Sequence, residues 1–382
     1  MGAGFAALAK GFTWPHDAAE ARNRDSLRVA GDSDHIVADA AARIFADLAD
    51  PQTLNREKDD GWKAPLWRAL ENAGLPLAWV PDHLGGAGAS LADGFAILGE
   101  TGRHALPVPI AETLAAGWLL AQAAIPSPAG AMTVAPVRAN ETIDIDADGA
   151  LSGRARAVPF APEAKHIAVL VSGSKGPAVA LVAAADCRLD RGLSLAGEPS
   201  SGIIFAGVKP QRFSPAPHLD RHALLLMGAT MRSLEIAGAL EAILALSVAY
   251  ANERVAFERP IAKFQAVQQN LARLAGETAA ALAVSGSAAD AIAQADAFDD
   301  AVLLEVASAK IRCAEAATEG AAIAHQVFGA IGFTKEHVLH RFTLRMLAWR
   351  DDFGNESMWA AKLGTDVARR GADEFWPLVA SR

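Results

Sequence analysis

The chain has 382 residues, of which 52% are hydrophobic and only 21% charged, so it can bury a large core and is not a mostly disordered protein. Acidic residues number 44 against 35 basic ones, and the resulting net charge of −9 argues against a nucleic-acid-binding protein. Its two cysteines cannot build a disulfide framework, so we expect a cytoplasmic protein with reduced thiols.

The first part of the chain has a helical pattern. Residues 1–30 read as an N-terminal extension that contributes little to the fold, and residues 31–125 as an N-terminal α-helical domain. Over residues 35–49 apolar side chains recur at three- and four-residue steps, which is typical of an amphipathic helix. Asp50-Pro51 ends that helix, because proline cannot continue it.

The middle of the chain, residues 126–222, predicts a β domain. Prolines and glycines separate short runs such as TIDID, which alternates as a half-buried strand does, and HIAVLV, which suggests a more buried strand. This spacing favours a small antiparallel barrel or sandwich.

Residues 223–382 are helical again. The stretch 224–256 has no proline and predicts one long helix ending near Arg254. Two alanine-rich periodic stretches follow, and alanine permits close packing of helices. No run of about 18 uncharged apolar residues predicts a membrane span, and no ligand spacing predicts a metal site.

The most informative block is YANERVAFERPIAKFQAVQQNLA, residues 250–272. A helix running to Arg254 breaks before Pro260 and then restarts. Such a break exposes backbone groups and a guanidinium together, which suits anion binding. The alternative is an ordinary helix–turn–helix with a structural arginine.

This block resembles the acyl-CoA dehydrogenase flavoprotein pattern, roughly Y-A-x-x-R-x-x-F-G-x-P-I-x-x-F-Q-x-x-Q, with Glu258 in place of the family's usual glycine. HQVFGAIGFTKEHVLHRF, residues 325–342, is similar to its Q-x-x-G-G-x-G-Y/F-T-x-E segment. GLPLAWVPDHLGGAGAS, residues 74–90, is similar to its N-terminal signature. The order of the three blocks agrees with the helix–strand–helix organisation inferred above.

The resemblance implies a multidomain α+β fold, with an N-terminal helical domain, a middle β-barrel or sandwich and a C-terminal four-helix bundle. It also implies an FAD enzyme that removes two hydrogens from an acyl-CoA thioester. Arg254 and Phe257 would meet the FAD pyrophosphate, partly across a subunit interface, and an arginine fork matches that group better than lysine does. Phe264, Gln265 and the segment from Gln326 to Gly329 would hold other parts of the cofactor.

The resemblance further implies partners. Electrons would pass to an electron-transfer flavoprotein, and the chain would form a homotetramer or a heterotetramer with a related chain. The segment around Glu235 resembles a branch of the family found among actinobacterial sterol- and CoA-ester-degrading enzymes. The alternatives are a catalytically silent subunit of a heterotetrameric dehydrogenase and an oxygen-using flavoprotein of the same fold.

The reaction needs a carboxylate base, and here the sequence departs from the family. The two usual base positions fall on Phe353 and Gly228, neither of which is a carboxylate. Glu235 lies seven residues beyond Gly228, near the same helical face, in an apolar run where desolvation would raise its pKa. We therefore predict Glu235 as the base. The alternative reading is a polar residue paired with Arg232.

The sequence also offers two alternative bases, and one predicted strand departs from the family pattern. Asp351 and Asp352, beside Arg350, are the alternative bases if the last loop is shifted. In the strand that resembles the family's T-E-P segment, the threonine and glutamate positions hold Val134 and Ala135. This change fits a subunit that shares its site with a non-identical partner, or a homo-oligomer with an altered acyl pocket.

Overall fold

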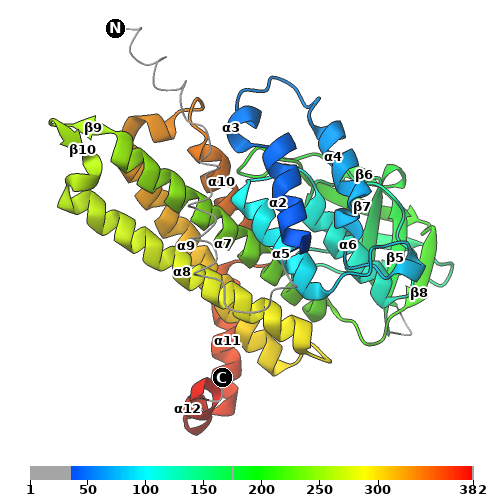
Figure 1. Cartoon of the computed structure of the whole chain (residues 1–382). Coiled ribbons are helices and arrows are strands. Elements are labelled where there is room, and N and C mark those ends of the chain that lie inside the picture. Colours follow the sequence, from blue (N-terminus) through cyan, green and yellow to red (C-terminus); the bar gives the residue numbers. More distant parts are fainter. Residues whose placement is uncertain (1–35, 174–175, 381–382) are drawn as a thin grey trace.

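The computed structural model describes residues 36–173 and 176–380, so the extension expected over residues 1–30 lies outside the described residues. Along the chain, a group of helices is followed by a group of strands and then by a second group of helices (Figure 1). The predicted α+β architecture is therefore confirmed.

Most of the N-terminal helices bury one apolar face, whereas the last of them is buried on all sides. In the first of them the apolar spacing buries Ala38, Ala41 and Phe45. The helix before the strands is apolar on every side and lies between the sheet and the C-terminal helices. The bounds are α2 Ile36–Leu48, α3 Pro51–Leu54, α4 Lys63–Asn72, α5 Leu91–Arg103 and α6 Ile110–Gln122, with short 3-10 turns η1 Leu75–Leu77 and η2 Asp82–Leu84.

The strands form one mixed sheet in the order β6-β7-β3-β2-β4-β5-β8, with β1 paired to β4. Their bounds are β1 Met132–Ala135, β2 Ile143–Ile145, β3 Leu151–Pro159, β4 His166–Gly173, β5 Gly176–Ala183, β6 Arg188–Asp190, β7 Ser200–Val208 and β8 Arg212–Pro215, with η3 Ala184–Asp186 before β6. The sheet is not wholly antiparallel, because β1 and β2 both run parallel to β4. Long connections precede β4 and allow these crossovers.

The second helical group contains a bundle of four helices, namely α7 Arg221–Glu253, α8 Gln265–Gln294, α9 Asp300–Phe328 and α10 Leu339–Trp349. Between α7 and α8 stand a small hairpin, β9 Val255–Ala256 with β10 Arg259–Pro260, and the turn η4 Ile261–Lys263. The turn η5 Gly329–Phe333 follows α9, and α11 Glu356–Arg370 and α12 Ala372–Ala380 end the described chain.

Helix α7 is the centre of the molecule, since it packs on α5, α8, α9 and α10. Glycines bring it very close to α5: a Cβ on Gly102 would stand 2.0 Å from the Glu235 carbonyl oxygen, and one on Gly238 2.1 Å from that of Gly99. By length and composition α7 could cross a membrane, but 61% of its most apolar window is buried inside the structure, as expected of a bundle's central helix.

Candidate functional site

The six residues predicted to hold a cofactor lie at the end of the bundle where α7 and α9 both end. The Tyr250 hydroxyl of α7 donates a hydrogen bond to the Phe328 carbonyl oxygen of α9 at 3.3 Å, and the two rings stack with centroids 4.4 Å apart. This contact holds the two helix ends together. It therefore brings Arg254, which caps α7, to the same end as Gly329, which caps α9.

The hairpin β9–β10 projects from this end of the bundle (Figure 1). Arg259 pairs with Ala256, so Phe257 and Glu258 form a two-residue turn, with φ of 50° and 67°. A tight hairpin turn of this kind needs positive φ at both central residues, which is why glycine is favoured there. Glu258 thus keeps the left-handed geometry at the position where the family pattern has glycine.

The side chains at this end face outward. Phe257 is 89% exposed, and Arg254, Gln265 and Gln326 are exposed as well. Among the described residues, no carboxylate lies within salt-bridge distance of the Arg254 guanidinium. Phe264 is half-buried, with the Arg259 guanidinium 4.3 Å from its ring centroid.

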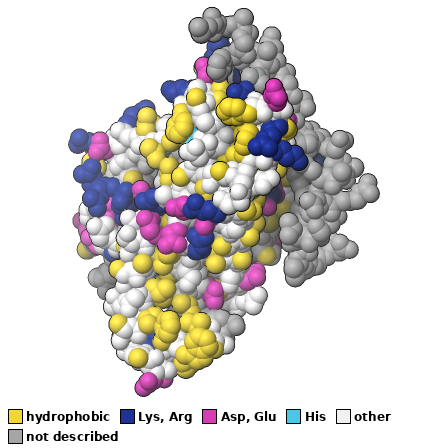
Figure 2. Space-filling view, turned by 90° about the vertical axis from the view of Figure 1, so that its left-hand side faces the viewer, with side chains coloured by type: hydrophobic (Ala, Val, Ile, Leu, Met, Phe, Trp, Pro, Cys, Tyr) yellow, Lys and Arg dark blue, Asp and Glu magenta, His cyan; other side chains and the backbone are white. Residues whose placement is uncertain are grey.

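Gly329 leaves the backbone open at the same end. Its φ is 63°, and no atom lies within 4 Å of the place where a Cβ would stand. Figure 2 shows this side of the molecule, where Lys and Arg side chains gather in the upper half beside hydrophobic ones. An unpaired guanidinium, exposed aromatic surface and accessible backbone fit the diphosphate and flanking groups of a dinucleotide.

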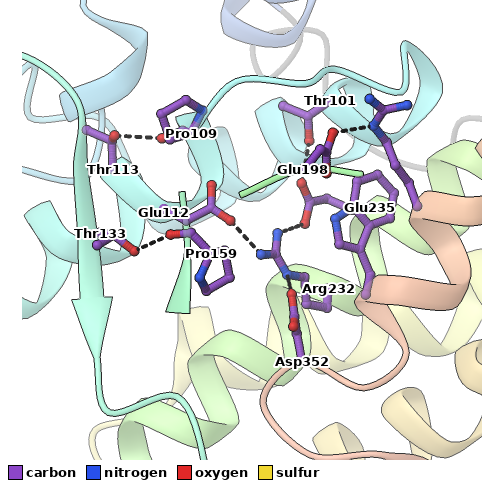
Figure 3. Close-up of polar contacts among 12 residues, drawn as sticks. Thr101, Pro109, Glu112, Thr113, Thr133, Pro159, Glu198, Arg232, Glu235 and Asp352 are labelled. Carbon is purple, nitrogen blue, oxygen red and sulfur yellow. Dashed lines mark hydrogen bonds and ion pairs between the residues drawn. The ribbon is translucent and has the colours of Figure 1, made fainter. Parts of the chain in front are cut away.

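The predicted base lies elsewhere, in a buried cluster around Arg232 (Figure 3). The Arg232 guanidinium donates to Glu235 at 2.5 Å, to Glu112 of α6 at 2.5 Å and to Asp352 at 3.0 Å. The Thr101 hydroxyl of α5 donates a hydrogen bond to the other Glu235 carboxylate oxygen at 3.1 Å. The pairing of Glu235 with Arg232, given above as the alternative reading, is therefore present, and it is joined by two further carboxylates.

Three carboxylates contact one guanidinium in this cluster, so the negative charge of the ionised carboxylates would exceed the single positive charge of Arg232. Burial, together with the neighbouring Glu112 charge, raises the pKa of Glu235 to about 7 despite Arg232. Burial also raises the pKa of Glu112, whose Oε2 has no hydrogen-bond partner among the described residues. Burial lowers the pKa of nearby Lys310 to about 8, and its Nζ donates to the Trp349 carbonyl oxygen at 2.6 Å. Glu235 is thus able to hold or release a proton near neutral pH.

The two usual base positions of the family pattern meet each other in space. A Cβ built on Gly228 would lie 2.1 Å from the Phe353 ring, and Phe353 is only 3% exposed. The neighbouring Asp352 points into the Arg232 cluster, whereas Asp351 is exposed and outside it. Both base positions are therefore filled by apolar packing, with no carboxylate between them.

The strand expected to frame a flavin ring is also apolar and buried at the two positions that the resemblance singled out. Val134 and Ala135 of β1 are 1% and 0% exposed. The hydroxyl of the preceding Thr133 is already used, since it donates to the Pro159 carbonyl oxygen of β3 at 2.8 Å (Figure 3). At these two positions β1 therefore carries neither the hydroxyl nor the carboxylate of the family pattern.

The two groups of predicted residues do not form one pocket. Glu235 and Arg254 are 19 residues apart on α7, which corresponds to about 28 Å along a helix axis. The sequence reasoning missed Glu112 and Lys310. Glu112 had a signal, an isolated charge in an otherwise apolar helix, which indicates a buried partner. Lys310 had none, because α9 carries several other charged residues.

Comparison with known proteins agrees with the resemblance. The family described as acyl-CoA dehydrogenase, C-terminal domain, matches residues 222–358. Acyl-CoA dehydrogenase IpdE2 of Mycobacterium tuberculosis is 30% identical over 88% of this chain and 96% of its own length. A solved structure of a variant of the steroid ACAD Tcur3481-Tcur3483 is 25% identical, with a TM-score of 0.76 over 87% of this chain and 97% of that one. The ChsE4-ChsE5 complex from Mycobacterium tuberculosis, 24% identical, has the same fold, with a TM-score of 0.77 over 90% and 99% of the two chains.

Proposed function

This chain belongs to the acyl-CoA dehydrogenase family, and we propose that it works as one subunit of a hetero-oligomeric acyl-CoA dehydrogenase. The enzyme would introduce an α,β double bond into an acyl-CoA thioester. The observation that carries this proposal is the packing of Phe353 on Gly228. It closes both base positions of the family pattern, whereas the end of the bundle at Arg254 stays open. A related partner chain would then supply the base.

FAD is the cofactor that we assign to the assembly, and when bound it supplies the acceptor for the hydride. The exposed guanidinium of Arg254 would bind the diphosphate in a bidentate manner. The open backbone at Gly329 would allow close approach, and Phe257, Phe264, Gln265 and Gln326 would flank the rest of the nucleotide. Because the hairpin projects outward, these residues would serve a flavin seated mainly on the partner chain.

The likeness to two-protein assemblies supports a non-identical partner. The structures named Tcur3481-Tcur3483 and ChsE4-ChsE5 complex each name two proteins, and the first is called a steroid ACAD. We therefore propose a steroid-derived acyl-CoA as the substrate class and an electron-transfer flavoprotein as the electron acceptor. We place the enzyme in the cytoplasm, since Cys187 and Cys313 are both free thiols.

A second candidate function is an active dehydrogenase that carries its own base at Glu235. The pKa of about 7 favours it, because a base near neutrality is well matched to proton abstraction. For this role the carboxylate would have to leave Arg232 and Thr101 and reach a substrate carbon.

The two candidates differ in what the chain does alone. We expect the chain expressed alone to be colourless and unable to reduce an artificial acceptor with an acyl-CoA. Co-expression with a related chain that carries Glu or Asp at a base position should give a yellow, active complex, and E235Q in this chain should leave turnover within a few-fold. A yellow and active protein without a partner, inactivated by E235Q, would establish the second candidate instead.

A further inference from the structure

A cavity of about 410 Å³ opens between the α3–α4 segment, the β6–β7 loop and α10. None of the residues predicted to bind a cofactor or to act as base lines it. Its volume is in the range of small-molecule sites, which start at about 300 Å³. The cavity is therefore a separate feature of the molecule.

The cavity wall combines apolar and cationic side chains. Trp62, Phe160 and Leu193 give it an apolar surface. Four cations stand among five carboxylates in its wall, namely Lys58, Lys63, Arg341 and Arg345. Phe160 is 6% exposed and Leu193 is 72% exposed, so they mark the inner wall and the rim. Such a wall suits a molecule with an apolar body and a charged group.

Two of these four cations, Lys63 and Arg345, already have partners, and Lys58 is exposed to solvent. The Lys63 ammonium pairs with Asp60 at 3.1 Å and with Glu163 at 2.9 Å. Arg345 pairs through Nε with Glu198 at 2.7 Å and donates through a terminal nitrogen to the Arg341 carbonyl oxygen, also at 2.7 Å. Their charges are therefore compensated within the chain.

Arg341 is different. Its Nε is buried and has no hydrogen-bond partner within residues 36–173 and 176–380. In the same part of the chain, no carboxylate lies within salt-bridge distance of its guanidinium. Burial, followed by the Arg345 charge, lowers the pKa of Arg341 to about 10, while Glu198 offsets only part of this. The side chain as a whole is half-buried, and only Nε is a buried atom without a partner. A buried donor without a partner is costly, and an anion in the cavity that accepts from Nε would remove that cost.

We propose that this cavity binds a small organic anion, with its carboxylate or phosphate group on Arg341 and its apolar body against Trp62 and Phe160. The site is independent of the proposed dehydrogenase function, since it needs neither FAD nor a base. Carboxylate and phosphate oxygens both match the guanidinium fork, so the test has to distinguish a ligand with a carboxylate from one with a phosphate group.

Isothermal titration of the full chain tests the proposal with octanoate, octyl phosphate, octanol and inorganic phosphate as probes. We expect one of the two alkyl anions to bind with a stoichiometry of one per chain and octanol to bind far more weakly. The tighter anion identifies the charged group. R341Q should weaken its binding by about tenfold or more, because charge-assisted hydrogen bonds are lost. R273Q, at a surface arginine paired with Glu319 on the bundle, should leave binding unchanged.

A rim variant keeps the test valid if R341Q does not fold. Leu193 is exposed, so L193E should fold and should weaken binding by placing a negative charge at the cavity mouth. The proposal is overturned if neither alkyl anion binds, if inorganic phosphate alone binds, or if R341Q and L193E bind the alkyl anions as tightly as the unaltered chain.

Discussion

The ring of Phe353 occupies the space that a side chain on Gly228 would need. A Cβ at Gly228 would stand 2.1 Å from this ring, far inside van der Waals contact. The two residues stand at the positions where the family pattern that the sequence resembles places a base. Their contact packs α7 against the segment between α10 and α11 and leaves no room for a side chain at position 228.

Gly228→Ala tests this packing directly. The added methyl must displace the Phe353 ring, and overpacking of this kind costs about 1–3 kcal/mol in the free energy of unfolding. Urea unfolding of the variant and of the unaltered chain measures the difference. Gly276→Ala is the matched control, since nothing lies within 4 Å of its Cβ in α8 and alanine stabilises a helix by about 0.5–1 kcal/mol. A Gly228→Ala chain as stable as Gly276→Ala would contradict the contact.

The Arg232 cluster predicts a pH dependence of stability. Because the pKa of Glu235 is raised to about 7, the folded state binds its proton more tightly than the unfolded state does. This carboxyl group therefore stabilises the fold fully only below its unfolded pKa, and the contribution is lost as pH rises toward 7. The free energy of unfolding of the unaltered chain should thus fall, relative to that of E235Q, between about pH 4.5 and pH 7.

Urea unfolding midpoints of E235Q and of the unaltered chain, measured over this pH range, show whether the stability difference changes in the predicted direction. Glu319→Gln, at an exposed residue on α9, is the control and should run parallel to the unaltered chain. If the stability difference between E235Q and the unaltered chain stayed constant or moved in the opposite direction, the raised pKa would be wrong.

Much of the fold was predictable because helices leave a local signal. The spacing of apolar residues over α2 and the absence of proline in α7 both gave the helices within a few residues of their observed ends. The strand β3 was missed, since its sequence LSGRARAVP mixes arginines and glycine with the apolar residues. Its place in the centre of the sheet comes from pairing with β7 and β2, which the local pattern does not contain.

The candidate site likewise has one part that the local sequence predicted and another that depends on long-range packing. The contact between Arg232 and Glu235 was foreseeable, because residues three apart face each other on a helix. Glu112 and Asp352 reach the same guanidinium from positions 120 residues away on either side. Only the packing of α6 and of the α10–α11 segment on α7 brings them together. No spacing rule in the sequence could have given this cluster.

Arg254→Lys should weaken the binding of FAD by the assembled enzyme. Lysine keeps the charge but loses the fork that matches a diphosphate, and the loss of a charge-assisted hydrogen bond is worth about 1.5–3 kcal/mol, or roughly 10–150-fold in affinity. Flavin retained after gel filtration and the dissociation constant from fluorescence titration measure the effect. Arg273→Lys, at a surface arginine on α8, should retain FAD like the unaltered enzyme, and equal retention by Arg254→Lys would argue against the diphosphate contact.

The number of FAD molecules per chain tests the central claim most directly. We would co-purify this chain with a related chain that carries a carboxylate at a base position, and measure flavin absorbance against total protein by amino-acid analysis. Since Val134 and Ala135 replace the threonine and glutamate of the strand that frames the flavin in the family pattern, we predict one FAD for each pair of unlike chains. One FAD for every chain, or a full complement of FAD on this chain purified without a partner, would contradict the assignment.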